Sequence, residues 1–200
     1  KKAVQLLDRL GYQVLFVDHP DCGRPQISKG MLDEAKALAE KNIITFDELI
    51  DKETPLVGIE PSAILTFRDE FIGLTRDTLQ AKAKRLAKFT FTIEEFLAKE
   101  VEKGNISEAQ FLEEEKLIKV HGHCHQKSLS SMTPTKKILS LPKNFKVHMI
   151  PSGCCGMAGS FGYEKEHYEL SMQIGELVLF PTVREQPEEV IIAASGTSCR

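Results

Sequence analysis

Four of the five cysteines lie in the second half of the chain, and each follows a segment whose composition predicts a β-strand. They are Cys124, Cys154, Cys155 and Cys199. In an open parallel sheet, the loops after the carboxyl ends of the strands line one crevice, so residues far apart in sequence can meet there. Four thiolates around one point suit an iron–sulfur cluster or a structural zinc ion, since both take soft sulfur ligands. The sequence therefore favours a metal site formed by these four residues.

Three histidines surround the first of these cysteines, in the run His121, His123, Cys124, His125. Alternate residues of an extended segment point to one side, so the three imidazoles could share a face. We interpret them mainly as hydrogen-bond donors to the site or as helix caps, with His123 kept as an auxiliary ligand. Cys22, in the first half, is interpreted as a small core hydrophobe and is the second auxiliary candidate.

The composition excludes several classes of protein. The chain has 200 residues, with 26 basic and 29 acidic side chains and a net charge of −3, and no basic block that would bind nucleic acid. No apolar run reaches the roughly 18 residues of a membrane span, and no signal segment is visible. An odd cysteine count with a vicinal pair argues against a disulfide framework. We expect a cytoplasmic protein, with the inner face of the membrane as a second location to which it could attach.

Periodicity predicts an α/β fold with short, mostly parallel sheets. A helix is expected around Val4–Leu10, and Ser28 is expected to cap a helix that runs through Ala39. The sequence also predicts five strands, at Val14–Val17, Leu56–Ile59, Leu117–Val120, Lys146–Ile150 and Glu189–Ala194. Thr92 and Glu95 form a capping-box pattern, and Glu60, Arg68 and Asp69 are interpreted as an ion pair that braces a loop.

The chain contains a weak internal repeat. VLFVDHPDCG from Val14 aligns with VHMIPSGCCG from Val147, and LVGIEPSAIL from Leu56 aligns with IAASGTSCR from Ile192. The alignment pairs Cys22 with Cys155. We therefore predict two similar α/β halves, residues 1–78 with a degenerate site and residues 116–200, joined by a helical connector over residues 79–115. Because the chain starts inside a helical pattern, we also expect it to lack the opening strand and to be part of a longer polypeptide.

With these motifs in view, the sequence resembles the cysteine-rich CCG domain family. The family includes the cysteine-rich component of heterodisulfide reductase, the iron–sulfur component of glycolate oxidase, and the C-terminal part of fused FAD-linked oxidases of the D-lactate or glycolate dehydrogenase type. The resemblance is carried by HGHCHQKSL at His121–Leu129, GCCGMAGSFGYE at Gly153–Glu164, SGTSCR at Ser195–Arg200, CGRPQISKG at Cys22–Gly30 and EPSAILTFRDE at Glu60–Glu70.

The resemblance implies that Cys124, Cys154, Cys155 and Cys199 hold a cluster of the 4Fe–4S type. It also implies an oxidoreductase that is a flavoprotein: FAD in another part of the same polypeptide oxidises a 2-hydroxy acid, and this part passes electrons to a quinone, a cytochrome or another iron–sulfur protein. The chain alone would not be a complete enzyme.

Departures from the family pattern are concentrated in the first half. Asp21 stands where a vicinal cysteine pair would begin, and Ala63 where another cysteine is usual, so two thiolates are absent there. Gly196 replaces the first cysteine of a closing Cys-x-x-Cys. The second half is thus expected to carry the redox function. Two alternatives are a structural module with zinc or no metal at the cysteines, and thiol chemistry of the heterodisulfide-reductase kind at the vicinal pair.

Overall fold

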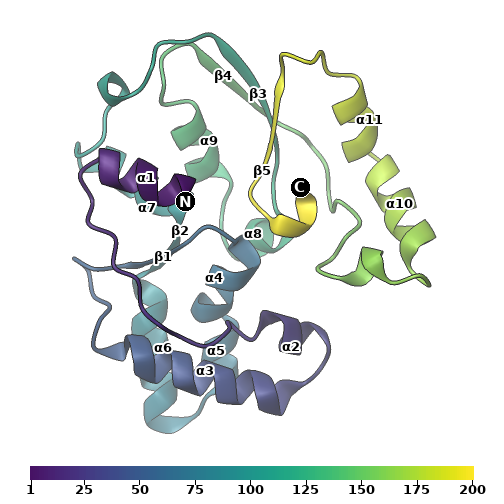
Figure 1. The fold of residues 1–200 in the computed structure, drawn as a ribbon. Helices are drawn as coiled ribbons and strands as arrows, with labels where there is room; N and C mark the ends of the chain where they lie inside the picture. The colour runs from purple at the N-terminus through teal and green to yellow at the C-terminus, as the bar shows by residue number, and fades with distance from the viewer. The chain divides into compact units, whose positions relative to one another are not determined.

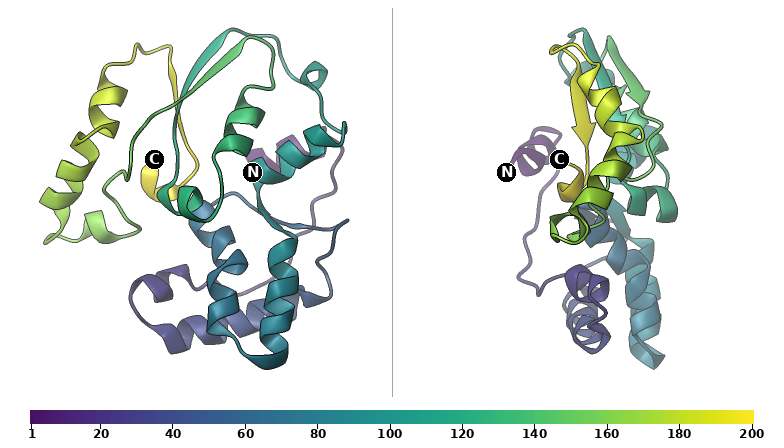
Figure 2. Two further views of the ribbon diagram at one scale, coloured as in Figure 1. Left: turned by 180° about the vertical axis from the view of Figure 1, so that it is seen from behind. Right: turned by 90° about the vertical axis from the view of Figure 1, so that its right-hand side faces the viewer.

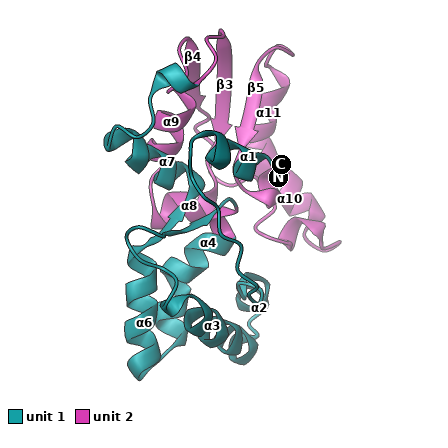
Figure 3. Ribbon diagram, turned by 60° about the vertical axis from the view of Figure 1, so that its left-hand side comes forward, with its two compact units in different colours: residues 1–59, 63–110 teal, residues 60–62, 111–200 magenta.

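The computed structural model describes residues 1–200 and confirms the α/β class (Figure 1). The chain divides into two compact units, residues 1–59 with 63–110 and residues 60–62 with 111–200 (Figure 3). Both units contain a short parallel sheet, which is two-stranded in unit 1 and three-stranded in unit 2. No helix combines the length and the apolar character that a membrane crossing requires.

Unit 1 is mainly helical. Its elements are α1 (Lys2–Arg9), α2 (Arg24–Ser28), α3 (Leu32–Asp47), β1 (Leu56–Gly58), most of α4 (Pro61–Arg68), α5 (Glu70–Leu74), α6 (Asp77–Lys88), β2 (Thr90–Thr92), α7 (Ile93–Glu102) and the 3-10 turn η1 (Glu108–Gln110). The apolar positions of α3 recur at helical spacing, and Ala35, Ala39, Ile43 and Phe46 are all buried. These residues pack against α5 and α6 and form the core of the unit.

Residues 79–115, for which the sequence predicts a helical connector, contribute to this core. Ala83 and Leu86 of α6 are fully or almost fully buried in it. The same stretch also supplies β2, which pairs with β1 in parallel. The capping box is confirmed: the Thr92 hydroxyl accepts from the Glu95 N–H at 3.3 Å, and the Glu95 carboxylate accepts from the Thr92 N–H at 3.0 Å. Unit 1 therefore extends through the helical segment as far as Gln110.

Three local expectations are wrong. Val14–Val17 forms no strand, and Leu15 and Phe16 are exposed, because no neighbouring strand is present to hydrogen-bond with this segment. Ser28 is the last residue of α2 rather than a cap, and α3 begins after Met31 with no side-chain cap. Arg68 pairs with Glu95 of α7 at 2.8 Å and not with Glu60, because the neighbouring helix offers a nearly buried carboxylate.

Unit 2 holds the three-stranded sheet in the order β4-β3-β5, with all pairs parallel. Its elements are β3 (Lys116–His121), α8 (Cys124–Leu129), α9 (Thr133–Leu139), β4 (Phe145–Met149), η2 (Phe161–Tyr163), α10 (Tyr168–Glu176), α11 (Leu179–Arg184), β5 (Ile191–Ala194) and η3 (Thr197–Cys199). Ile118 and Val120 of the central strand are buried with Val147 of β4. Figures 1 and 2 show η3 and α8 side by side beyond the carboxyl ends of β3 and β5.

The order of elements agrees with the proposed repeat, apart from the missing strand at Val14–Val17. The first half runs α1, an extended segment, α2 and α3, then β1, and the second runs α9, β4, α10 and α11, then β5. The superposition of Cys22 on Cys155 stays a prediction.

Removal of the capping box should destabilise unit 1. Thr92→Ala deprives the Glu95 N–H of its acceptor, and we expect a loss of about 1 kcal/mol, as for other helix caps. Chemical denaturation followed by circular dichroism measures the change. Thr78→Ala, at an exposed position of α6, is the matched control and should change the free energy of unfolding by less than about 0.5 kcal/mol.

Helices α3 and α6 are also joined by a charge cluster. Lys82 and Arg85 each contact Asp47 at 2.8 Å, and these contacts, the hydrogen bond from Lys82 first, hold the pKa of Asp47 below its ordinary value of 3.8. A carboxylate whose pKa is lowered by folding stabilises the fold above its unfolded pKa, and the contribution disappears as the pH falls through the folded value.

The stability difference between wild type and Asp47→Asn should therefore depend on pH. At pH 7 we expect the variant to be less stable by about 0.5 to 1 kcal/mol, the range for pairs with exposed partners. Below pH 3.8 the difference should shrink. Denaturation midpoints measured from pH 7 to pH 2.5 check this; a difference that stays constant over that range contradicts it.

Candidate metal centre

The carboxyl ends of β3, β4 and β5 lie at one edge of the sheet because all three strands run parallel. Cys124 begins α8 just beyond β3, the vicinal cysteines follow β4, and Cys199 ends η3 beyond β5. The Sγ atoms of Cys155 and Cys199 are 3.6 Å apart and share a hydrogen bond. Residues separated by 44 positions in sequence thus come into direct contact.

Cys154 and Cys124 adjoin this pair. Cys154 packs against the small apolar cluster that contains Cys155 and Leu179 and has Cys199 at its margin. The Cys124 thiol interacts with that of Cys154, and partial burial, followed by this neighbouring sulfur, raises the pKa of Cys124. All four cysteines of the predicted ligand set are therefore brought to one edge of the sheet.

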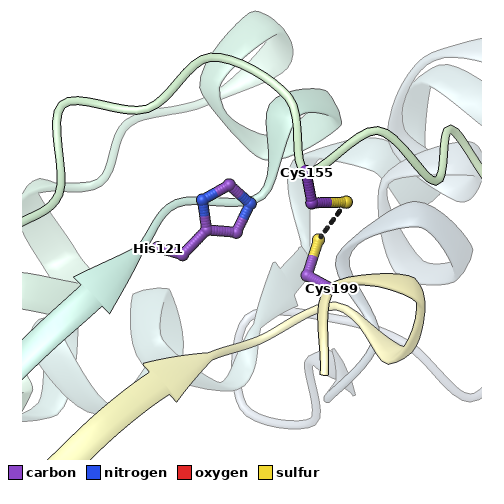
Figure 4. Close-up of side chains that lie close together, drawn as sticks. All are labelled: His121, Cys155 and Cys199. Carbon is purple, nitrogen blue, oxygen red and sulfur yellow. Dashed lines mark hydrogen bonds between the residues drawn. The ribbon is translucent and has the colours of Figure 1, made fainter. Parts of the chain in front are cut away.

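His121 is the imidazole that lies closest to the sulfurs. As the last residue of β3 it is only 1% exposed, and one of its ring nitrogens lies within 4.8 Å of the Sγ atoms of both Cys155 and Cys199 (Figure 4). Its Nδ1 is 2.6 Å from the Ser152 hydroxyl, whereas its Nε2 is buried without a hydrogen-bond partner. An unpaired buried nitrogen beside two sulfurs fits a site whose ligand is a metal or cluster.

The two auxiliary candidates have other surroundings. His123 is buried at the N-cap position of α8, but its side chain makes no capping hydrogen bond; its Nε2 lies 4.0 Å from a Glu60 oxygen. Burial lowers its pKa, which favours the neutral ring. The sequence singled it out over His121, but it is His121 that groups with Cys155 and Cys199. Cys22 belongs to unit 1, where it packs against the helical core, as expected of a small hydrophobe.

The short contact between the Cys155 and Cys199 sulfurs limits the negative charge that the two thiols can carry together. The hydrogen bond between the two sulfurs lowers the pKa of Cys155 and raises the pKa of Cys199. One proton shared between two thiols leaves one negative charge on the pair, since two adjacent thiolates repel each other. A bound cation would remove this restriction, because metal-bound thiols lose their protons.

Polar side chains that no sequence pattern identifies hold two of the cysteine loops in place. The ammonium group of Lys127 donates to the carbonyls of Ser152 and Gly153, at 2.8 and 2.9 Å, and so fixes the loop before the vicinal cysteines. Fully buried Gln126 accepts from Ser195 at 3.3 Å, just before η3. Both side chains come from α8. No pattern in the sequence identifies which polar residues of a short helix will be buried.

Glu60 braces the last loop. It accepts from the backbone N–H of Thr197 at 2.6 Å and from its hydroxyl at 2.7 Å, while Ser62 donates to its other oxygen. Burial opposes ionisation of the carboxyl, but these hydrogen bonds hold its pKa below the ordinary value. The turn that ends at Cys199 is thus tied to a carboxylate far away in sequence.

Glycine is required immediately after the vicinal pair. Gly156 has a φ of +96°, and a Cβ at this position would collide with the backbone oxygen of Ser171. The Gly156 N–H donates to the Cys154 sulfur at 3.3 Å. A larger residue at position 156 would therefore displace the loop and remove the hydrogen bond to the Cys154 sulfur, which is a candidate ligand.

A cleft of about 630 Å³ opens beside the centre. Apolar side chains of α11 and β5 form much of its wall, among them Leu179, Val183 and Ile192, and His121 and Cys199 also line it. Small molecules can therefore approach Cys199, which is partly exposed, from this side.

With this geometry, residues 118–199 match the family model described as a cysteine-rich domain, CCG. This match covers less than half of the chain and includes Cys124, Cys154, Cys155 and Cys199. The whole chain is also similar to larger proteins. It is 26% identical, over 98% of its length, to a D-2-hydroxyglutarate dehydrogenase of Pantoea ananatis and covers 18% of that protein.

Two further relatives are a component of a different dehydrogenase and a lactate utilization protein. The chain is 25% identical to one component of the anaerobic glycerol-3-phosphate dehydrogenase of Escherichia coli, over 98% of the chain and 48% of the relative. It is 27% identical to lactate utilization protein A of an Exiguobacterium species, over 97% of the chain and 78% of the relative. The chain thus spans less than a fifth of the first relative and about half of the second. No solved structure matches it.

Loss of the Glu60 carboxylate should expose Cys199. Glu60→Gln removes a charge-assisted acceptor worth at least about 1.5 kcal/mol, which corresponds to roughly tenfold more frequent opening of the turn. We expect Cys199 in the metal-free protein to be alkylated faster by about that factor, as measured by peptide mass spectrometry. Glu113→Gln, which removes an exposed carboxylate paired with Lys143, serves as the control and should leave the rate unchanged.

Proposed function

We propose that this chain is the iron–sulfur electron-transfer part of a flavin-linked dehydrogenase that oxidises a 2-hydroxy acid. The observation that carries the proposal is the convergence of Cys124, Cys154, Cys155 and Cys199 at one sheet edge, with the Cys155 and Cys199 sulfurs 3.6 Å apart. Two of the relatives described above are dehydrogenases by name, and the third is a lactate utilization protein.

In this proposal the four cysteines hold a 4Fe–4S cluster through their thiolates. When bound, such a cluster accepts and releases single electrons. The chain's own task is to preset the ligands: Lys127 ties down the loop before the vicinal cysteines, and Gln126 and Glu60 both hold the loop that ends at Cys199. The Gly156 N–H donates to a ligand sulfur, a contact of the kind that tunes reduction potential.

Substrate oxidation is assigned to FAD in another part of the same polypeptide, so this chain is not a complete enzyme by itself. Electrons would leave through a quinone, a cytochrome or another iron–sulfur protein, at the cytoplasmic side of the membrane. D-Lactate, glycolate and D-2-hydroxyglutarate are all 2-hydroxy acids of the proposed substrate class. The first half takes no part in this transfer, because Asp21 and Ala63 offer no thiolates and Cys22 lies against the core of unit 1.

A structural zinc site is the second candidate, because His121, Cys155 and Cys199 form a mixed nitrogen and sulfur set that zinc also accepts. Anaerobic purification with metal and sulfide analysis separates the two. A brown protein with iron and acid-labile sulfide supports electron transfer. A colourless protein with one zinc per chain and no sulfide contradicts it.

Cys155→Ser in the full-length protein should abolish cluster iron and electron delivery to an artificial acceptor. Reduction of the flavin by substrate should continue, since it does not depend on this site. Cys22→Ser is the matched control: it should retain the iron and cost about 1 kcal/mol of stability, a typical packing loss. Equal loss of iron in both variants would show that the first half also holds a cluster.

A further inference from the structure

Among the groups at the metal centre, one buried donor is not used by the four-cysteine arrangement. The Nε2 atom of His121 has no hydrogen-bond partner, although the residue is only 1% exposed. A buried polar atom without a partner costs roughly 1 to 3 kcal/mol unless something fills its place. Its polar surroundings include the Cys155 sulfur, with which His121 interacts, so the nitrogen is placed to bind a cation together with that sulfur.

The tautomer and orientation of this ring are set by its other nitrogen. Nδ1 of His121 lies 2.6 Å from the hydroxyl of Ser152, which is itself buried. When Nδ1 donates its proton to that oxygen, Nε2 carries a lone pair. Metal-binding imidazoles are typically held in this way, with one nitrogen bonded to an oxygen and the other free for the metal.

The free nitrogen faces sulfur. A ring nitrogen of His121 and the sulfurs of Cys155 and Cys199 lie within 4.8 Å of one another, and Nε2 is the one that Ser152 does not occupy (Figure 4). The ring projects from the last residue of β3, so the rigid central strand of the sheet fixes its position. By contrast, Cys124 is exposed and Cys154 only half-buried.

We propose that His121 binds the metal centre through Nε2, as an imidazole ligand oriented by Ser152. This inference rests on the proposed function, since it concerns the same site. The innermost ligands are then His121, Cys155 and Cys199, with Cys154 and Cys124 toward the outside. His121 is then a fifth ligand beside the four cysteines. Because its imidazole is neutral, it adds no negative charge to that of the thiolates, whereas a fifth thiolate in its place would lower the reduction potential.

The primary test is a spectroscopic one on the full-length protein. Protein labelled with ¹⁵N-histidine is purified anaerobically, the cluster is reduced, and the coupling of nitrogen to the electron spin is measured by pulsed paramagnetic resonance. We expect a strongly coupled histidine nitrogen in wild type and in His123→Gln, and its loss in His121→Cys. The added thiolate in His121→Cys should also move the cluster to a lower potential.

Two results of this measurement overturn the inference. One is a loaded cluster without any strongly coupled histidine nitrogen, in which case the cysteines alone bind it. The other is a coupling that disappears in His123→Gln and persists in His121→Cys, which would assign the role to the neighbouring imidazole. Both results leave the proposed electron-transfer function intact.

A second measurement uses Co²⁺ as a probe of the same donors without sulfide. Metal-free protein is titrated with Co²⁺ under anaerobic conditions, and the ligands are identified by X-ray absorption. We expect nitrogen and sulfur in the first shell, and an affinity lower by about 10- to 100-fold in Ser152→Ala, the usual effect of removing a partner that orients a ligand. An unchanged affinity in Ser152→Ala, together with a shell of sulfur only, contradicts the inference.

The two measurements distinguish the two failures. If Co²⁺ binds through His121 but no preparation holds iron and sulfide, the electron-transfer function fails and the imidazole ligand stands. If neither iron nor cobalt binds, both ideas fail.

Discussion

Parallel pairing on both sides of β3 is the constraint on which the rest of unit 2 depends. Because β4 and β5 each pair in parallel with the central strand β3, all three strands end at the same edge of the sheet. Any polar or ligating residue in the next few positions is then delivered to a common region. His121, Cys155 and Cys199 meet for this reason, although 78 residues separate the first from the last.

Convergence of strand ends places loops within reach of one another, but buried polar contacts decide their final geometry. Lys127, Gln126 and Glu60 reach from short segments to the backbone or hydroxyls of the cysteine loops. Gln126 is fully buried and Glu60 partly so, and such groups are costly to bury unless their hydrogen bonds are made, which leaves the loop that ends at Cys199 few alternative positions. This rigidity suits a centre that transfers electrons, since ligands that are already positioned need little rearrangement.

Electrostatics link this geometry to function. The thiols of Cys155 and Cys199 hydrogen-bond to each other, whereas two adjacent thiolates in this site would repel each other. Ordinary packing gives no reason to gather four cysteines and an unpaired imidazole nitrogen at one sheet edge, whereas coordination of iron or zinc does.

The sequence by itself determined the class of the fold and the candidate cysteines. Alternation of strand and helix patterns predicts an α/β protein, and cysteines that follow strands are expected at one edge, since these are properties of local periodicity and of parallel sheets. The capping box of α7 was equally readable, because all of its contacts lie within four consecutive residues. Local signals of this kind require no knowledge of distant neighbours.

Only the tertiary structure decided which groups touch. Val14–Val17 has a strand-like composition but no strand beside it. Arg68 pairs with Glu95, and Glu60 accepts hydrogen bonds from Thr197, so the expected pairing of Arg68 with Glu60 does not form. His121 outranks His123 as a ligand candidate because its ring lies beside Cys155 and Cys199 and its second nitrogen meets Ser152. Each of these outcomes depends on a contact between residues far apart in sequence, and spacing along the chain carries no record of such contacts.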